Sequence, residues 1–307
     1  ANDRLLTAGV LHVIKRSMYP VLVKLGPLPI HTFGVMLAIG ILVGSTILLR
    51  ETKRLGDPRI TEVLVERLVW YMVLGVVLGG RAMYVIVEMF RGNTEFQRNP
   101  LKLFAVWEGG LVMYGGLLAV FSAVILFARK NRIDIWRLCD LCSPPLFIGD
   151  AIGRWGCFFA GDYYGRETSA WLGIRFTRAD SLVPAALRGV PLHPTQIYMS
   201  AKALIIALVL FWISRRKKFD GQVTGIALMM YAVLRSTVEY FRGDEDRGNL
   251  LGMSTAQFTS IFVFATGVAV LLMVPRKMLA DDLAQPGYAP AAERASSTGK
   301  NKSKKKR

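Results

Sequence analysis

Cysteine and histidine are scarce in this chain of 307 residues, which contains three of each. Cys139 and Cys142 form a CxxC pair, but the pair lies inside a hydrophobic segment, and the histidines are scattered along the chain. Metal sites and dithiol redox motifs need such residues in larger sets at short spacings. The sequence therefore disfavours a metal centre, redox chemistry or any cofactor, and helix packing explains the cysteines better.

Acidic residues are also few, with 22 Asp and Glu against 39 Lys and Arg and a net charge of +17. A basic surplus binds either nucleic acid or anionic lipid. No nucleic-acid-binding fold accompanies the basic run at Ser303–Arg307, so anionic membrane lipid is the expected counterpart. We predict that residues 278–307 form a disordered, basic cytoplasmic tail.

Neither a cleavable leader nor internal repeats are expected from the sequence. Leu5–Ile14 is apolar but is broken by His12 and followed by Lys15 and Arg16, without a small-residue cleavage site. This pattern favours an amphipathic helix at the membrane surface. The simplest organisation is one integral membrane catalytic domain, residues 1–277, followed by the tail.

Apolar residues, in contrast, are abundant: they make up 52% of the chain, and its mean hydropathy is +0.37. This composition predicts an all-α, polytopic membrane protein. A helix needs about 20 apolar residues to cross a bilayer. Seven windows approach that length, near Ile30–Leu49, Leu68–Phe90, Leu111–Phe127, Ile133–Phe159, Gln196–Ser214, Gln222–Phe241 and Thr255–Val274.

The fourth window is the least hydrophobic, because it carries Asp140, Pro144, Pro145, Asp150 and Arg154. An arginine at the bilayer centre costs about 2.5–3.5 kcal/mol even on the lenient insertion scale. Such a residue suggests a function and an anionic partner. We therefore interpret this window as a buried helix that lines a site.

The orientation follows from the distribution of Lys and Arg, which remain on the cytoplasmic side of span ends. They are concentrated in the first, third and fifth connections and in the tail. With seven spans, this predicts an N-terminus outside and a C-terminus in the cytoplasm. The long connection 161–192, between spans four and five, would then face the periplasm as a head or lid over a site.

This topology brings charged and titratable residues from six spans into the outer leaflet. They are His31, Arg81, Tyr114, Arg154, Asp162, His193, Arg235 and Glu239. Arginine binds phosphate through paired, charge-assisted hydrogen bonds. A surplus of guanidinium groups in one leaflet therefore predicts a site for a phosphate-bearing lipid.

Structural explanations also exist for single residues in this set. Arg81 could pair with a helix end or reach the interface, and Arg235 with Glu239 could form an intrahelical ion pair. His193 before Pro194 could simply begin a helix. Lys202, in the fifth span, is interpreted as a charge that reaches the interface or faces another helix.

Five sequence blocks resemble the bacterial prolipoprotein diacylglyceryl transferases, in the order and spacing of that family. They are Gly79-Gly80-Arg81, Trp107-Glu108-Gly109-Gly110 with Gly115-Gly116-Leu117, the glycine-rich block Gly153–Arg166, His193–Tyr198, and Arg235–Arg242. Together they cover spans two to six. The expected seven spans agree with the family.

The resemblance implies an enzyme of the bacterial inner membrane that transfers the diacylglyceryl group of phosphatidylglycerol to the lipobox cysteine of prolipoprotein signal peptides. Glycerol phosphate is the other product. The residues gathered in the outer leaflet, together with the resemblance, predict a catalytic set and a lipid-binding set. The catalytic set is Arg154, Arg235, Tyr114, His193, Asp162 and Glu239, and the lipid-binding set is Arg154, Arg81, Arg242, His31, Gly165 and Gln196.

Four positions depart from the common form of the family. Tyr114 replaces a histidine, Cys157 an asparagine, Asp162 a glutamate and Phe33 a tyrosine. Tyrosine, with an ordinary pKa near 10, is a poor general base. The proton acceptor therefore remains open among His193, Asp162, Glu239, Tyr114 and the substrate phosphate, and Cys157 is either a packing residue or a covalent nucleophile.

Three other functions remain open at this point. They are a family paralogue with altered lipid or acceptor, a lipid-binding protein without turnover, and a transporter of anionic solutes. A transporter requires polar groups through the inner half of the bundle. The inner halves of spans one, three, five and seven are largely apolar, which disfavours that function.

Overall fold

The protein is mostly helical, as predicted. The computed structural model describes residues 19–25, 28–93, 95–105, 110–243, 249–250, 252–276 and 281–282. Seven long helices lie among these residues: α2 (Thr32–Leu55), α3 (Glu62–Phe90), α5 (Met113–Asn131), α6 (Ile135–Ala160), α7 (Thr195–Ser214), α8 (Gln222–Glu239) and α9 (Thr255–Met273). The expected helix at Leu5–Ile14, the residues Trp107, Glu108 and Gly109, and nearly all of the tail lie outside the described residues.

Each predicted span coincides with one of these helices. Five of the described helices, α2, α3, α5, α7 and α9, are long and apolar enough to cross a membrane. Large apolar side chains such as Leu42, Leu78 and Phe121 are exposed along them, as expected of surfaces that face lipid. Helices α6 and α8 carry the charged residues of the predicted site and fall short of that threshold. The chain is therefore a membrane protein, and its span count and orientation stay predictions.

Several helices extend beyond the predicted windows. Helix α3 begins six residues earlier, at Glu62, where the Thr61 hydroxyl accepts a hydrogen bond from the Leu64 amide. Helix α6, in contrast, agrees closely with its window and is continuous through Pro144 and Pro145. Hydropathy locates the apolar part of a helix, whereas its ends are set by caps and backbone hydrogen bonds.

Short strands lie before α2, between α6 and α7, and between α8 and α9, and they modify the all-α prediction. The pairs are β1 (Val21–Leu25) with β2 (Leu28–His31), β3 (Ile174–Arg175) with β4 (Pro191–Leu192), and β5 (Asn249–Leu250) with β6 (Met253–Ser254), all antiparallel. Shorter helical segments are α4 (Glu95–Arg98), η1 (Pro100–Phe104) and η3 (Ala185–Leu187). Backbone groups in these connections thus find partners outside the long helices.

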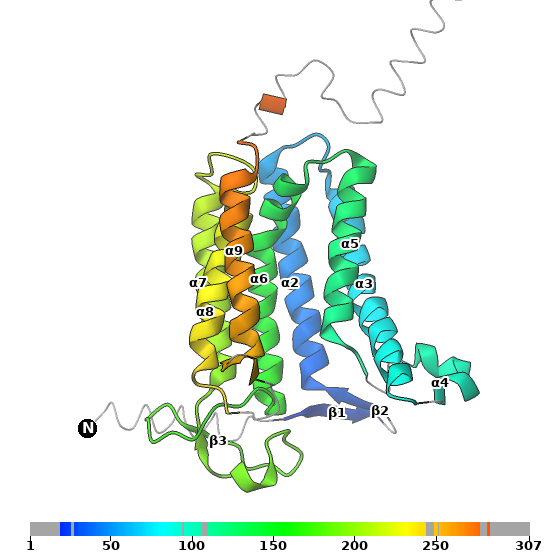
Figure 1. Cartoon of the computed structure of the whole chain (residues 1–307), viewed down its shortest axis with the longest axis vertical. Helices are drawn as coiled ribbons and strands as arrows, with labels where there is room; N and C mark the ends of the chain where they lie inside the picture. Colours follow the sequence, from blue (N-terminus) through cyan, green and yellow to red (C-terminus); the bar gives the residue numbers. More distant parts are fainter. Residues whose placement is uncertain are drawn as a thin grey trace, which may run out of the picture. The chain divides into compact units, whose positions relative to one another are not determined.

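The chain divides into two compact units, one of residues 1–47 with 140–276 and the other of 48–139 with 277–307. In the first unit, α6, α7, α8 and α9 run alongside one another (Figure 1). Its core is formed by Phe147, Ala151, Ala203, Ile206, Ala207, Leu210, Val223 and Ala227. The predicted boundary between a catalytic domain and a tail at residue 277 stays a prediction.

Glycines bring the helices of each unit close together. A Cβ atom on Gly40 of α2 would lie 2.8 Å from the carbonyl oxygen of Gly149 in α6. In the second unit, a Cβ on Gly115 of α5 would lie 2.3 Å from the Gly79 carbonyl oxygen of α3. Small residues at such crossings are typical of membrane helices. The glycines of two family-like blocks are therefore needed for helix packing.

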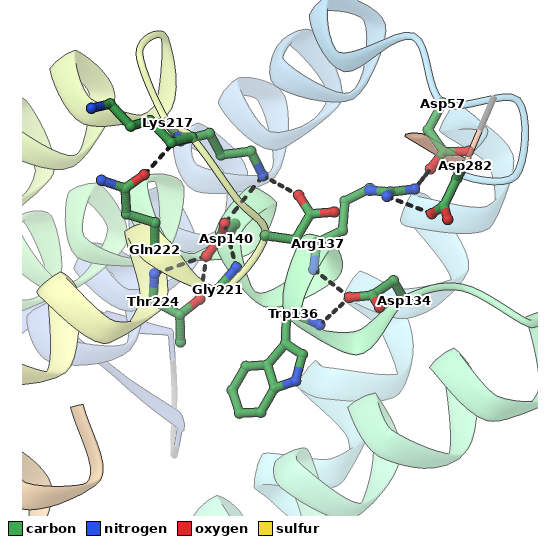
Figure 2. A network of polar contacts seen from close by, with 12 residues as sticks. Asp57, Asp134, Trp136, Arg137, Asp140, Lys217, Gly221, Gln222, Thr224 and Asp282 are labelled. Carbon is green, nitrogen blue, oxygen red and sulfur yellow. Dashed lines mark hydrogen bonds and ion pairs between the residues drawn. The ribbon is translucent and has the colours of Figure 1, made fainter. Parts of the chain in front are cut away.

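Asp140 of α6 holds the beginning of α8 (Figure 2). Its carboxylate, 3% exposed, accepts hydrogen bonds from the amides of Gly221 and Thr224 and from the Thr224 hydroxyl, at 2.8–2.9 Å. Lys217 Nζ lies 3.1 Å from the same carboxylate. A carboxylate at a helix N-terminus accepts hydrogen bonds from the otherwise unpaired amides and interacts favourably with the positive end of the helix dipole.

Replacing Asp140 with alanine should destabilise the protein by about 3–5 kcal/mol, because the first amides of α8 lose their buried partner and Lys217 keeps only Asp220. Thermal unfolding of the detergent-solubilised protein measures this loss. Asp180→Asn, which removes half of an exposed ion pair with Arg178, is the matched control and should leave the midpoint unchanged. Equal midpoints for both variants would contradict the capping role.

Arg137, also on α6, belongs to the second unit and is fully buried. Its Nη1 lies 2.8 Å from Asp57 and its Nη2 2.7 Å from Asp282 (Figure 2). Asp282 is one of the two residues of the predicted tail that the structure describes. The tail therefore has an ordered contact near its start.

Candidate active site

Arg154 lies near the C-terminal end of α6, one helical turn after Asp150. The distance from its Nε to the Asp150 carboxylate is 3.1 Å. Its guanidinium carbon also lies 5.5 Å from the centre of the Tyr163 ring, and the guanidinium interacts with the Cys157 thiol. A guanidinium has five N–H donors, and the bond to Asp150 uses the one on Nε.

Arg235 and Glu239 form an ion pair at the end of α8, as their spacing predicts. Glu239 is 4% exposed, and its carboxylate also lies 3.6 Å from Nη1 of Arg242. One buried carboxylate thus holds two arginines in place.

Tyr163 connects these two groups of charges. Its ring centre lies 4.6 Å from the guanidinium carbon of Arg242, in addition to its contact with Arg154. Such cation–π contacts stabilise a cation by about 0.5–2 kcal/mol. A continuous chain of contacts within one unit therefore joins six residues in this order: Asp150, Arg154, Tyr163, Arg242, Glu239 and Arg235.

The backbone at Tyr163 is unusual, with φ of 57°. A bulky side chain rarely adopts this left-handed conformation, which tends to occur at functional sites. Gly161, two residues earlier, has φ of 76°, and the Thr195 hydroxyl donates a hydrogen bond to the Tyr163 carbonyl. These features turn the chain sharply after α6 and bring Tyr163 between the two arginines.

Gly165 lies where three segments of backbone cross. Its amide donates to the His193 carbonyl at 3.1 Å, and the next amide, of Arg166, donates to the Phe241 carbonyl at 2.9 Å. A Cβ atom on Gly165 would lie 2.4 Å from the His193 oxygen and 2.8 Å from the Phe241 oxygen. The glycine is needed for this crossing, which joins the head loop to both α7 and the end of α8. Its predicted contact with lipid is not tested.

His193 and Asp162, two of the candidate bases, lie near this crossing. His193 Nδ1 is 3.1 Å from the Tyr198 hydroxyl, and its ring meets Phe241 edge-on at 5.2 Å. Asp162 accepts a hydrogen bond from the Tyr163 amide at 2.8 Å, and its carbonyl accepts one from Gln196 Nε2 at 2.7 Å. Asp162 thus lies directly beside Tyr163, whereas the His193 ring lies against Tyr198 of α7 and Phe241.

The 161–192 loop has its own hydrophobic core, made of Phe158, Ile174, Phe176, Val183 and Leu192. The β3–β4 pair lies within it and joins Ile174 to Leu192 and Arg175 to Pro191. This packing gives the head a fixed structure. Its predicted role as a lid is not tested.

Three other predicted site residues have different surroundings. Arg81 is 6% exposed and donates hydrogen bonds to the carbonyls of Leu103, Lys102 and Gly110. It lies in the second unit and binds the connection between α3 and α5. Tyr114, at the start of α5 in the same unit, is 64% exposed, and His31 ends β2 with an exposed side chain. Lipid binding by Arg81 and His31 and a catalytic role for Tyr114 stay predictions.

Comparison with known proteins agrees with these motifs. Residues 20–273 match the prolipoprotein diacylglyceryl transferase family. The chain belongs to this family.

Several relatives support the assignment along nearly their whole length. A phosphatidylglycerol–prolipoprotein diacylglyceryl transferase of Bordetella bronchiseptica is 34% identical over 263 residues, covering 84% of this chain and 95% of the relative. Proteins of the same name from Clostridium tetani and Geobacter sulfurreducens are each 34% identical, covering 82% and 84% of this chain and 96% of each relative.

The structure places one departure from the common form of this transferase family inside the site. Cys157 is buried one turn after Arg154 and interacts with its guanidinium. Cys157 is therefore a buried neighbour of Arg154. Its role, as a packing residue or as a covalent nucleophile, stays a prediction.

Sequence reasoning missed three residues in or beside this chain of contacts. Asp150 was seen only as an unfavourable charge, although its position four residues before Arg154 predicts an ion pair. Tyr163 lies between Gly161 and Gly165 of the glycine-rich block, which marked the turn but not the tyrosine. Tyr231, one turn before Arg235 on α8, lies under the Lys202 ammonium and had no signal in the sequence.

Proposed function

We propose that this membrane enzyme transfers the diacylglyceryl group of phosphatidylglycerol to the lipobox cysteine of prolipoprotein signal peptides. The observation that carries the proposal is the continuous chain of contacts from Asp150 to Arg235, which holds three guanidinium groups in one unit. Family membership and the names of the relatives support the same reaction.

The chemistry requires positive charge at the leaving group. The cysteine sulfur attacks the glyceryl carbon, a carbon–sulfur bond forms, and the carbon–oxygen bond to the phosphate breaks. The thiol proton goes to a base or to the departing phosphate, and glycerol phosphate leaves. Arginines fixed in advance stabilise the charge that develops on the phosphate, without reorganisation at the moment of reaction.

Arg154 and Arg235 are proposed to hold this phosphate, and Arg242 to bind the headgroup from the loop side. Gln196 is completely buried, and its Oε1 has no hydrogen-bond partner among the described residues. An amide oxygen in that position suits a hydroxyl of the glycerol headgroup. The thiol proton is proposed to go to His193, Asp162, Glu239, Tyr114 or the phosphate itself.

The site is proposed to face the outer leaflet of the bacterial inner membrane, with loop 161–192 in the periplasm and the tail in the cytoplasm. The distribution of Lys and Arg supports this orientation. It is the side on which a signal peptide emerges after translocation.

Mass spectrometry of a lipobox peptide, incubated with the purified protein and phosphatidylglycerol, tests the reaction. We expect a peptide mass increased by one diacylglyceryl group, together with free glycerol phosphate. A peptide with serine in place of cysteine and vesicles of phosphatidylcholine alone are the controls. No adduct, when the Bordetella bronchiseptica relative makes one under the same conditions, would overturn the proposal.

A further inference from the structure

Lys202 lies in the third turn of α7, within the helix's buried stripe. The other members of this stripe include Met199, Ala203, Ile206 and Leu210. At 3% exposed, Lys202 is as buried as its apolar neighbours and does not reach the membrane interface. Of the two sequence interpretations, the structure excludes an interfacial lysine and supports one that faces other helices.

The Lys202 ammonium has no hydrogen-bond partner in the part of the chain that the structure describes. Among the buried side-chain nitrogen and oxygen atoms that the structure describes, only Lys202 Nζ and Gln196 Oε1 are unpartnered. Lys202 Nζ lies over the face of the Tyr231 ring, 4.3 Å from the ring centre. An ammonium has three N–H donors, so a cation–π contact leaves its hydrogen-bonding capacity unused.

The charges around Lys202 are those of the candidate active site. Asp150, Arg154 and Arg235 are the groups that act on it electrostatically. Two of these are cations, and Asp150 already pairs with Arg154. A buried, unpaired cation beside two further cations is unfavourable. An additional anion among these groups would relieve the repulsion and satisfy the ammonium donors.

The position of Lys202 indicates the face from which it meets such an anion. It approaches from α7, Arg154 comes from α6 and Arg235 from α8, and all three belong to one unit. Tyr231, under the ammonium, precedes Arg235 by one helical turn. Lys202 therefore lies at the level of Tyr231 along α8. This level is one helical turn from Arg235, on the side away from Arg242.

We infer that Lys202 Nζ binds a phosphate oxygen of the lipid substrate from the deep side of the site, as a partner of Arg154 and Arg235. This inference rests on the proposed function for the identity of the lipid. The same chemistry would bind the phosphate of the product, glycerol phosphate. No bond is made or broken by Lys202, which acts as a binding residue.

Lys202→Met tests the inference, because methionine is unbranched, apolar and of similar length. We expect the KM for phosphatidylglycerol in mixed micelles to rise about 10- to 100-fold, the range for losing a hydrogen bond to a charged group, and the KM for the peptide to stay unchanged. Lys218→Met removes an exposed lysine near the other end of α7 and is the matched control. It should behave as the wild type.

A second measurement does not depend on turnover. Phosphatidylglycerol should raise the unfolding midpoint of the wild type relative to phosphatidylcholine, since a ligand of the native state stabilises it, and Lys202→Met should lose this rise. Titration with glycerol phosphate in place of the lipid distinguishes the sources. A rise with both ligands indicates a site for the phosphate, and a rise with lipid alone indicates that the acyl chains are also required.

Stability of the variant without added lipid separates binding from structure. Replacing a buried, unpaired charge with an apolar group should leave the midpoint unchanged or raise it. A lowered midpoint with an unchanged KM, or wild-type KM and lipid stabilisation in Lys202→Met, would overturn the inference. The wild type could give no adduct and still be stabilised by phosphatidylglycerol, with this stabilisation lost in Lys202→Met. In that case the proposed reaction would fail and the anion site would stand.

Discussion

Arg235→Ala is expected to lower kcat/KM for diacylglyceryl transfer about 10³-fold, the effect of removing a preorganised donor to a developing negative charge. Arg235 comes from α8 and is fixed by the buried carboxylate of Glu239. Its charge is therefore in place before the phosphate begins to leave. Transfer to the lipobox peptide, followed by mass spectrometry over time, gives the rate.

Arg235→Lys separates phosphate binding from the ion pair with Glu239. Lysine keeps the positive charge and can pair with Glu239, but it lacks the planar fork that binds two phosphate oxygens. We expect Arg235→Lys to fold normally and to remain at least tenfold slower than the wild type. Nearly normal transfer by this variant would mean that Arg235 only supports Glu239. Arg178→Ala, in the exposed part of the head loop, should be neutral.

Arg154→Ala should produce a loss of similar size, about 10³-fold in kcat/KM. Arg154 interacts with Asp150 and Cys157 of its own helix and with Tyr163 of the head loop. It therefore joins α6 to the head loop. Its replacement removes a guanidinium from the chain of contacts and leaves Asp150 without its ion-pair partner. The same time course of peptide modification measures the effect.

Asp150→Asn provides the matched comparison for Arg154→Ala. Both variants break the same ion pair, but only the second removes the cation proposed to bind phosphate. If Arg154 acts on the phosphate, Asp150→Asn should cost about tenfold at most, far less than Arg154→Ala. Equal losses in the two variants would assign Arg154 to the ion pair, and the double variant would show whether the effects are coupled.

The helices were largely predictable because their signals are local. A run of about 20 apolar residues satisfies its own backbone hydrogen bonds as a helix, whatever it packs against. Windows such as Gln196–Ser214 therefore agree with the structure within a residue. The short pair β3–β4 has no such local signal, because strand pairing joins segments that are apart in sequence.

The candidate site was predictable in its residues and less so in its contacts. The glycine-rich block and the Arg235–Glu239 spacing pointed to the region, and the ion pair follows from helix periodicity. Tyr163 as the connection between Arg154 and Arg242 required the backbone turn and the crossing at Gly165. Arg81, expected near lipid, binds three carbonyls of its own connection.

The sequence by itself determined that this is a helical membrane protein of the prolipoprotein diacylglyceryl transferase family, because apolar length and motif spacing are properties of the linear chain. The tertiary structure alone decided which charges are partners. Asp140 binds α8, Arg137 binds Asp57, and Lys202 is buried without a hydrogen bond to any described residue. The reason is physical: the energy of a charge in a membrane protein depends on which helix faces meet around it, and these faces come from distant parts of the sequence.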